Sequence, residues 1–224
     1  MRILNLFAGI GGNRTLWDKE HEITAVEHDQ KIAMIYLKRF PKDNVIVGDA
    51  YEYCLNHYEE FDFIWASPPC KTHTRMMAFP NMRNKLPDLR LYGLILFLDQ
   101  FFKGNYVIEN VISYYKPLVK PIAIVDRHYI WANFRIQNKT LKKPRGNIKD
   151  LSKEDLSQYL QVDLKLLTAA KLKNTRNHDP VRMVLRNCVV PEAGKYILDS
   201  LSNNATLEKW IFNEEKEGVQ QNGS

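Results

Sequence analysis

The sequence has few of the features that indicate a secreted, membrane-spanning or metal-stabilised protein. Only three cysteines occur among 224 residues, and they are widely spaced, which argues against a disulfide framework and a structural zinc site. No apolar run approaches the roughly 18 residues that a membrane span needs, and the first residues lack the pattern of a signal peptide. We therefore expect a cytoplasmic protein with no metal and no membrane association, whose thiols stay reduced and available for chemistry.

Acidic residues are outnumbered, with 26 Asp and Glu against 32 Lys and Arg, a formal net charge of +6. The excess is concentrated in residues 71–90, which contain one acid, and in residues 135–149, which contain none. Solvated loops are one interpretation, but two basic segments also favour contacts with phosphates. The residues predicted to bind nucleic acid are Lys71, Arg75, Arg83, Lys142, Lys143 and Arg145.

Short apolar runs alternate with amphipathic stretches through the first half of the chain. Strands are predicted over 3–7, 22–26, 45–47, 61–66, 106–108, 122–125 and 128–136, and helices over 13–19, 30–40, 51–58 and 88–102. This alternation predicts an α/β fold with a mostly parallel sheet and helices on both faces. In the second half we expect helical structure over 151–172 with Ser152 and Asp155 as a capping pair, a strand over 181–185 and a helix over 191–201.

Residues 5–12, which read N-L-F-A-G-I-G-G, form a strand followed by a glycine turn that lets a ligand approach the backbone. The adjacent last glycines depart from the dinucleotide-binding fingerprint, and no P-loop lysine follows. Glu27 ends the next apolar run, where open α/β sheets place a carboxylate on ribose hydroxyls. Asp49 follows the run after that, at a place where it could meet an adenine edge. A surface position for Glu27 and a helix N-cap for Asp49 are the alternatives. S-adenosylmethionine, a nucleoside without phosphates, suits this pattern better than NAD or ATP.

Cys70 follows a stiff Pro68-Pro69 pair, which restricts the backbone and fixes the direction of the thiol. Basic neighbours are expected to lower the thiol pKa and so increase the thiolate fraction; they are Lys71, His73 and Arg75. These features favour a nucleophile. The alternative, a buried core cysteine, is kept for the two other cysteines.

Glu109 comes at the end of the apolar run 106–108 and is followed by Asn110. A carboxylate in such a place must be paired or functional, because burying it alone is costly. If its pKa is raised, Glu109 can donate a hydrogen bond to a ring nitrogen. Asn110 is expected to brace the loop that holds Cys70.

In this order, these segments resemble the motifs of the cytosine-C5 DNA methyltransferases. Residues 5–12 resemble the family's first motif, 68–70 its Pro-Cys motif and 109–111 its Glu-Asn-Val motif. Residues 127–131 are more weakly similar to its Arg-x-Arg-x-aromatic strand, and 186–191 to its Gly-Asn-x-Val-x-Pro motif, which would return the chain to the cofactor pocket. The resemblance implies a Rossmann-like, S-adenosylmethionine-dependent fold.

The resemblance also implies roles for individual residues. Cys70 would attack C6 of a flipped cytosine, Glu109 would hydrogen-bond N3, and Arg127 would contact the target base. The residues predicted to bind the cofactor are Phe7, Ala8, Gly9, Gly11, Gly12, Glu27, His28, Asp49, Ala50, Pro69, Asn187 and Val189.

Three features depart from the family's pattern. Asn5 stands where the family has an acid or serine, Lys71 stands where it has glutamine, and residues 112–126 are too few for its usual helix and strand. We predict a catalytic and cofactor-binding domain over 1–135 and a small basic target-recognition segment over 136–180. The chain then returns to the catalytic domain over 181–212 and ends in a flexible tail over 213–224.

The sequence therefore predicts a monomeric DNA cytosine-5 methyltransferase that acts on double-stranded DNA. Because the recognition segment is short, its sequence specificity is relaxed, confined to a short site or supplied by a partner. Two alternatives remain at this point: an RNA (tRNA) cytosine-5 methyltransferase, and a catalytically silent nucleic-acid-binding or regulatory protein with the same fold.

Overall fold

The computed structural model describes residues 1–79, 86–142, 144, 150–172 and 179–202, and it contains a seven-stranded sheet of order β3-β2-β1-β4-β5-β7-β6. The strands are β1 (Arg2–Leu6), β2 (Glu22–Glu27), β3 (Asn44–Val47), β4 (Phe63–Ala66), β5 (Asn105–Val111), β6 (Ala123–Val125) and β7 (His128–Ala132). The first five strands are mutually parallel, whereas β7 runs antiparallel to β5 and β6. The predicted α/β class with a mostly parallel sheet is confirmed.

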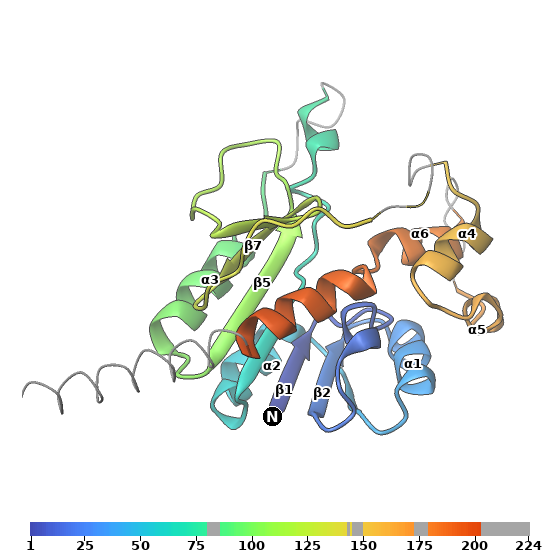
Figure 1. Ribbon diagram of the computed structural model, residues 1–224, viewed down its shortest axis with the longest axis horizontal. Helices are drawn as coiled ribbons and strands as arrows, with labels where there is room; N and C mark the ends of the chain where they lie inside the picture. The colour runs from blue at the N-terminus through green and yellow to red at the C-terminus, as the bar shows by residue number, and fades with distance from the viewer. Residues whose placement is uncertain (80–85, 143, 145–149, 173–178, 203–224) are drawn as a thin grey trace, which may run out of the picture.

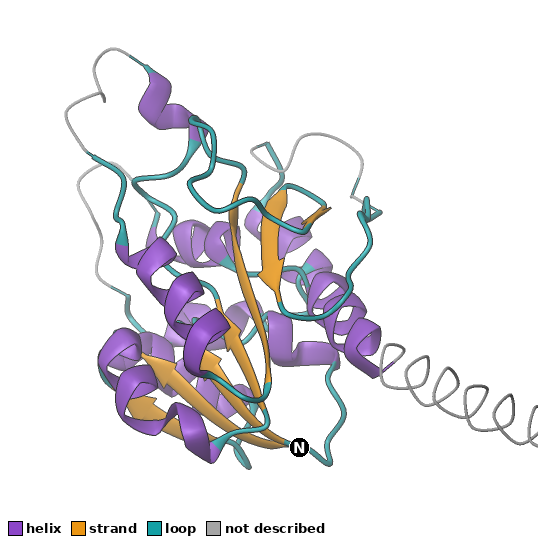
Figure 2. Cartoon of the chain, turned by 90° about the vertical axis from the view of Figure 1, so that its left-hand side faces the viewer, coloured by secondary structure: helices purple, strands orange, loops and turns teal. Residues whose placement is uncertain are grey.

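Helices lie on both sides of the sheet (Figures 1 and 2). The α-helices are α1 (Gln30–Arg39), α2 (Ala50–His57), α3 (Arg90–Phe101), α4 (Lys153–Tyr159), α5 (Leu164–Ala169) and α6 (Pro180–Asn187). Three short 3-10 helices are η1 (Asn13–Leu16), η2 (Tyr58–Glu60) and η3 (Arg75–Ala78), and a final helix occupies 191–202 of the described residues.

Strand residues alternate between two hydrophobic cores, as expected for a sheet covered on both faces. Ile3 and Phe63 point into a core shared with α1 and the final helix, whereas Leu4 and Ile64 point into a core shared with α2 and α3. All four side chains are fully buried. Burial on both faces explains why these strands read as continuous apolar runs in the sequence.

Helices α4, α5 and α6 pack together beside α1 (Figure 1) and share the core of the final helix. The helical prediction over 151–172 resolves into two helices, because the chain takes a left-handed turn at Gln161, where φ is 53°. The Ser152–Asp155 capping box is confirmed. The strand predicted over 181–185 is wrong.

That segment is helix α6, and its sequence carries the reason. Asp179 is the N-cap, whose carboxylate accepts hydrogen bonds from the backbone N–H groups of Val181 and Arg182, and Pro180 takes the first helical position. Val181 and Leu185, four residues apart, face the core together. This spacing fits a helix, and the β-branched composition misled the strand prediction.

Two buried polar networks lie beneath the glycine turn. Asn5 and Asn13 exchange amide hydrogen bonds, with Asn13 Nδ2 donating to Asn5 Oδ1 at 2.8 Å. Asn13 is the first residue of η1, whose N-cap is Gly12 and makes no side-chain cap bond. Asn5 thus fills the family's acidic position with an amide that satisfies another amide inside the core.

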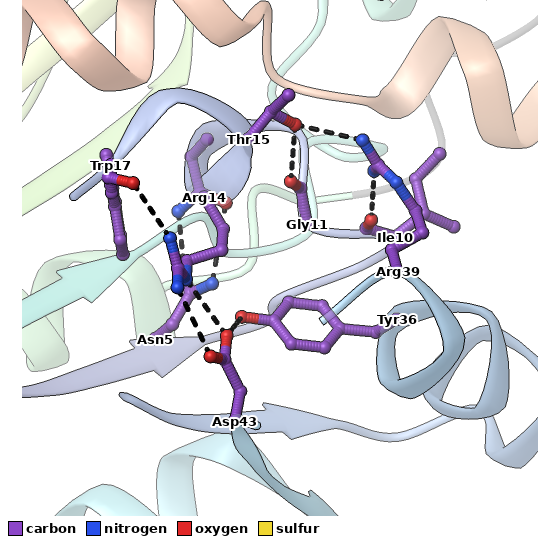
Figure 3. Close-up of polar contacts among 10 residues, drawn as sticks. Asn5, Ile10, Gly11, Arg14, Thr15, Trp17, Tyr36, Arg39 and Asp43 are labelled. Atoms are coloured by element: carbon purple, nitrogen blue, oxygen red, sulfur yellow. Dashed lines mark hydrogen bonds and ion pairs between the residues drawn. The ribbon is translucent and has the colours of Figure 1, made fainter. Parts of the chain in front are cut away.

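The second network centres on Asp43 (Figure 3). Arg14 Nε donates to Asp43 Oδ2 at 3.0 Å, Arg14 Nη2 donates to Asp43 Oδ1 at 3.3 Å, and Tyr36 Oη donates to Asp43 Oδ2 at 2.9 Å. The side chains of Arg14 and Asp43 are only 9% and 4% exposed. Burial and the adjacent Asp43 charge raise the pKa of Tyr36 well above its ordinary value, so its hydroxyl stays a donor.

In the part of the chain that the structure describes, no helix combines the length and apolar character that crossing a bilayer requires.

Replacing Asp43 by asparagine is expected to lower the free energy of unfolding by about 3–5 kcal/mol, because the buried Arg14 guanidinium loses its counter-charge. Urea denaturation measures this change. The matched control is Asp62→Asn, which breaks an exposed ion pair with Arg2 and should cost at most about 1 kcal/mol. Equal losses in the two variants would contradict the role given to this network.

Candidate functional site

The carboxyl ends of the five parallel strands lie along one edge of the sheet and carry the predicted site residues. In sheet order, Asp49 follows β3, Glu27 ends β2, the glycine turn follows β1, Cys70 follows β4 and Glu109 lies near the end of β5. Adjacent strands pair in register there, with Leu6 opposite Val26 and Ala66. This edge is where open α/β sheets bind their ligands.

The turn after β1 begins with an uncommon backbone conformation. Phe7 has φ of 55°, although it is not a glycine, and Gly9 and Gly11 also have positive φ. Such strained residues occur preferentially at functional sites. A Cβ built on Gly9 would meet nothing within 4 Å, whereas one on Gly11 would collide with Tyr36 and Phe40. The turn is therefore packed on its inner side and open above Gly9.

Glu27 organises this turn through both carboxylate oxygens. Gly9 N donates to Oε2 and Asp29 N donates to Oε1, each at 2.9 Å. Glu27 is half-buried, whereas the predicted neighbour His28 is exposed. Because two backbone donors fix the carboxylate in place, its remaining lone pairs have a defined direction.

Asp49 is the N-cap of α2, as one of its sequence interpretations stated. Its Oδ1 accepts hydrogen bonds from Tyr51 N at 2.8 Å and from Glu52 N at 3.1 Å. Capping uses a single oxygen, so it is compatible with a ligand contact through the other oxygen. Ala50 is buried directly behind it.

Arg39 ties the glycine turn to the helical cluster, a role that the sequence analysis missed. Its guanidinium donates to Ile10 O, to Thr15 Oγ1 at 2.9 Å and to Gln161 O at 3.2 Å (Figure 3 shows the first two bonds). Burial lowers the pKa of Arg39. The only sequence signal was a basic residue in the last turn of α1, a position usually explained by the helix dipole.

The chain returns to the glycine turn after α6, as the 186–191 motif predicted. A Cβ on Gly12 would lie 2.1 Å from Val189 O and 2.3 Å from Cys188 Sγ. Glycine is therefore required where these segments cross. Asn187 is exposed at the end of α6, and Val189 is half-buried.

The loop that carries Cys70 is braced by Asn110, as expected. Asn110 is 2% exposed, and its Nδ2 donates to Pro68 O at 2.9 Å. His73 N and Thr74 N both donate to Cys70 O, which closes a tight turn after the cysteine. Pro69 is exposed and Cys70 half-buried, so the thiol lies at the surface of the site.

The expectation of a lowered thiol pKa is wrong. Burial, followed by the negative charge of Glu109, raises the pKa of Cys70, while Lys71 and Arg127 oppose the shift. These interactions bring the three predicted catalytic residues, Cys70, Glu109 and Arg127, into one electrostatic neighbourhood. Arg75 instead lies exposed in η3.

His73 lies in an aromatic cluster with Tyr92 and Tyr115. Its side chain is 1% exposed, and Nδ1 lies 2.6 Å from the hydroxyl of Tyr115, which also accepts a hydrogen bond from Tyr92 Oη at 3.1 Å. Burial lowers the pKa of His73, so its ring remains neutral at physiological pH. His73 therefore supports the loop rather than activating Cys70.

Glu109 lies within β5 rather than at its end, because pairing with β7 extends the strand to Val111. It is 8% exposed, and its Oε2 lies 3.9 Å from His128 Nε2 on β7. Arg127 occupies the tight turn between β6 and β7, where Ile112 N donates to Arg127 O. His128 was missed because only the antiparallel pairing of β5 and β7 brings it to Glu109.

The predicted nucleic-acid contacts are spread over two regions. Lys71, the residue after Cys70, and Arg75, in η3, are exposed. Lys142 is exposed near α4, where its carbonyl accepts a hydrogen bond from Tyr159. Arg83, Lys143 and Arg145 lie outside the described residues. The described part of the chain contains no group of three acidic, histidine or cysteine side chains suited to a metal ion.

The strand order, the open glycine turn and the carboxylates after β2 and β3 form the ligand-binding edge of a Rossmann-like fold, the fold expected for a methyltransferase that uses S-adenosylmethionine. The residues present fit that cofactor, because Gly9 leaves space beside the fixed carboxylate of Glu27. Residues 1–76 match the family model for the C-5 cytosine-specific DNA methylases. These 76 residues contain the glycine turn and the Cys70 loop, so both lie in the part of the chain that is similar to this family.

Several solved structures are similar to the chain, all at low identity. A mutant of DNMT2 from Spodoptera frugiperda is 19% identical over 68% of this chain and 61% of its own, with a TM-score of 0.45. The methyltransferase EhMeth of Entamoeba histolytica is 15% identical over 70% and 64%, with a TM-score of 0.39. An S-adenosylmethionine-dependent methyltransferase of Agrobacterium tumefaciens is 15% identical over 54% and 40%, with a TM-score of 0.38.

The present chain thus spans less than two thirds of the length of each of these three proteins. No curated protein matches the sequence.

Changing Glu27 to glutamine is expected to weaken cofactor binding about tenfold, because the amide nitrogen would face a backbone N–H donor and charge-assisted bonds would be lost. Isothermal titration calorimetry with S-adenosylmethionine measures the dissociation constant. The control Glu22→Gln changes an exposed residue at the other end of β2 and should leave it unchanged. An unaltered constant for E27Q would contradict a role for this carboxylate.

Removing the Glu109 charge is expected to lower the pKa of the Cys70 thiol, because a neighbouring carboxylate disfavours the thiolate. The Glu109→Gln variant should therefore be alkylated by iodoacetamide at lower pH than the native protein, whereas Arg127→Gln should require higher pH. Mass spectrometry of the Cys70 peptide follows the reaction. Burial raises the pKa of Cys54 to about 12 and of Cys188 to about 11, so these thiols serve as internal controls. Shifts in the opposite directions would refute the assignment.

Proposed function

We propose that this protein is a DNA cytosine-5 methyltransferase that uses a covalent cysteine adduct. The observation that carries the proposal is the grouping of Cys70, Glu109 and Arg127 beside the glycine turn. The cytosine-C5 family match supports the chemistry, and the +6 charge supports a polyanionic substrate. The exposed cations Lys71 and Arg75 stand at the same edge of the sheet.

Cytosine C5 is a poor nucleophile while the ring remains aromatic, so the protein must first disrupt that aromaticity. In our proposal the Cys70 thiolate adds to C6, and Glu109 donates a hydrogen bond to N3, which receives the displaced electron pair. Arg127 orients the base. S-adenosylmethionine, when bound, supplies an electrophilic methyl group to C5. Transfer of the C5 proton to a water molecule, with the C5–H electron pair forming the C5–C6 double bond and the Cys70 thiolate leaving C6, then restores the aromatic ring.

The raised pKa of Cys70 gives Glu109 a second role in this mechanism. A charged Glu109 opposes formation of the thiolate. A protonated Glu109 that hydrogen-bonds N3 carries no charge, so it no longer opposes the thiolate, and Lys71 and Arg127 then favour it. The thiol would therefore become reactive mainly when a base occupies the site. This coupling limits side reactions of a free thiol.

In the proposed reaction, the DNA must change its conformation before the thiol can reach the target cytosine. The C6 atom of a stacked cytosine cannot be reached in a duplex, so the base would have to be flipped out of the helix. The residues after Cys70 form η3, which projects from the same edge of the sheet as the glycine turn (Figure 1). In the proposal this segment faces the extruded nucleotide.

The native protein is expected to transfer tritium from methyl-labelled S-adenosylmethionine to C5 of cytosine in duplex DNA, with nucleoside analysis as the measurement. Cys70→Ala should abolish transfer and covalent trapping on a 5-fluorocytosine duplex while retaining cofactor binding, because only the nucleophile is removed. The control Cys54→Ala, on α2, should still be trapped.

A competition assay with equal amounts of tRNA and duplex DNA tests the alternative that RNA is the substrate. In that case the label would appear on the tRNA. Label on adenine or on cytosine N4 would refute the chemistry. Full activity of the C70A variant would refute the covalent mechanism.

A further inference from the structure

Residues 112–122, which join β5 to β6, form an extended surface beside the Cys70 loop. Thr74 and Ser113 form an antiparallel bridge, and Tyr114 N donates to His73 O at 3.2 Å. Figure 1 shows this segment next to η3, above the carboxyl ends of the strands. The surface is thus continuous with the proposed catalytic site.

Alternate residues from 114 to 124 are exposed, although prolines interrupt the segment. The exposed residues are Tyr114, Lys116, Leu118, Lys120, Ile122 and Ile124. Leu118 is 66% exposed and Tyr114 36% exposed, so both side chains are accessible to a ligand. Apolar and cationic side chains therefore alternate along one line, and residues 112–125 include no acid.

Two intervening residues and the backbone of Ile122 anchor the segment to the domain. The Tyr115 hydroxyl bonds to His73 and Tyr92, Val119 O accepts a hydrogen bond from Trp131 Nε1 at 2.8 Å, and Ile122 N donates to Ile130 O at 2.8 Å. Because the segment is already ordered, binding a ligand does not cost the free energy of ordering it.

We propose that this line, the 114–124 ridge, binds the unpaired nucleic-acid strand that adjoins the target cytosine. Lys116 and Lys120 form no ion pair within the described residues, so they are available for phosphates. In a duplex the phosphates are accessible to the lysines, but the faces of the bases are stacked on one another and are not accessible to apolar side chains. Exposed apolar side chains gain contact area only from unstacked bases, with Tyr114 as the stacking platform.

The proposal rests on the proposed function and narrows it. The methylated cytosine would lie in a strand that is locally unpaired, which lowers the cost of presenting the base to Cys70. The ridge lies where the sequence analysis found too few residues for the family's usual helix and strand. It would supply strand contacts without reading a long sequence, because stacking and phosphate contacts tolerate any base.

Fluorescence anisotropy with a labelled unpaired 12-nucleotide DNA strand and the matching duplex tests the ridge without catalysis. The native protein should bind the unpaired strand more tightly than the duplex. Lys116→Ala with Lys120→Ala should reduce the slope of log affinity against log salt by about 1.4, which corresponds to two lost phosphate contacts. The control variant carries Lys42→Ala and Lys103→Ala, two exposed lysines that precede β3 and β5 at the amino ends of the strands, away from the site. It should leave the slope unchanged.

Tyr114→Ala should weaken binding of the unpaired strand by about fivefold or more, with the salt slope unchanged, whereas Tyr114→Phe should retain the affinity because its ring still stacks. In methyl-transfer assays Y114A should raise KM and leave kcat unaltered. The proposal would be overturned if the native protein bound the duplex more tightly than the unpaired strand. It would also be overturned if both the double lysine variant and Y114A kept the native affinity and salt slope for the unpaired strand.

The two proposals fail separately. If the ridge variants bind the unpaired strand as tightly as the native protein does, and the native protein methylates cytosine, the ridge proposal is wrong and the proposed enzymatic function stands. If strand binding depends on the ridge but the native protein transfers no methyl group, the proposed enzymatic function is wrong and the ridge remains a nucleic-acid-binding surface.

Discussion

Parallel pairing on both sides of β1 is the constraint on which the site depends. Because β2 and β4 flank β1 in register, the glycine turn, Glu27 and Cys70 leave the sheet at one edge. The proposed cofactor site lies over β1 to β3, and the proposed nucleophile, Cys70, follows β4 next to β5. A shift of register by one residue would turn every side chain to the other face of the sheet and separate the two halves.

Buried polar groups then hold the turns that the sheet brings together. The Arg14–Asp43 pair lies under the glycine turn, Asn110 fixes the Cys70 loop, and Arg39 joins the turn to the helical cluster. Removing water from such groups costs free energy, which their hydrogen bonds offset only when every partner is present. The arrangement favours one loop geometry over others, which is what the proposed methyl transfer between two bound molecules would require.

The antiparallel strand β7 distinguishes this site from a plain Rossmann arrangement. It extends β5 beyond the parallel sheet and brings His128 beside Glu109. The turn that precedes it presents Arg127 to the same neighbourhood as Cys70. The short 112–122 connection then follows the edge of the site instead of forming a further helix, and this leaves its alternate side chains exposed.

The sequence by itself determined the fold class, the strand–turn motifs and the capping of α2 and α4, because these depend on local patterns of apolar, glycine and capping residues. It failed where packing decides between local possibilities. Residues 181–185, which include two valines, were predicted as a strand, yet they form a helix that packs Val181 and Leu185 into the core. The raised pKa of Cys70, the burial of His73 and the clamp made by Arg39 were decided only by tertiary structure. Each arises from groups far apart in the chain, whose charge and desolvation exist only once the strands have been brought together.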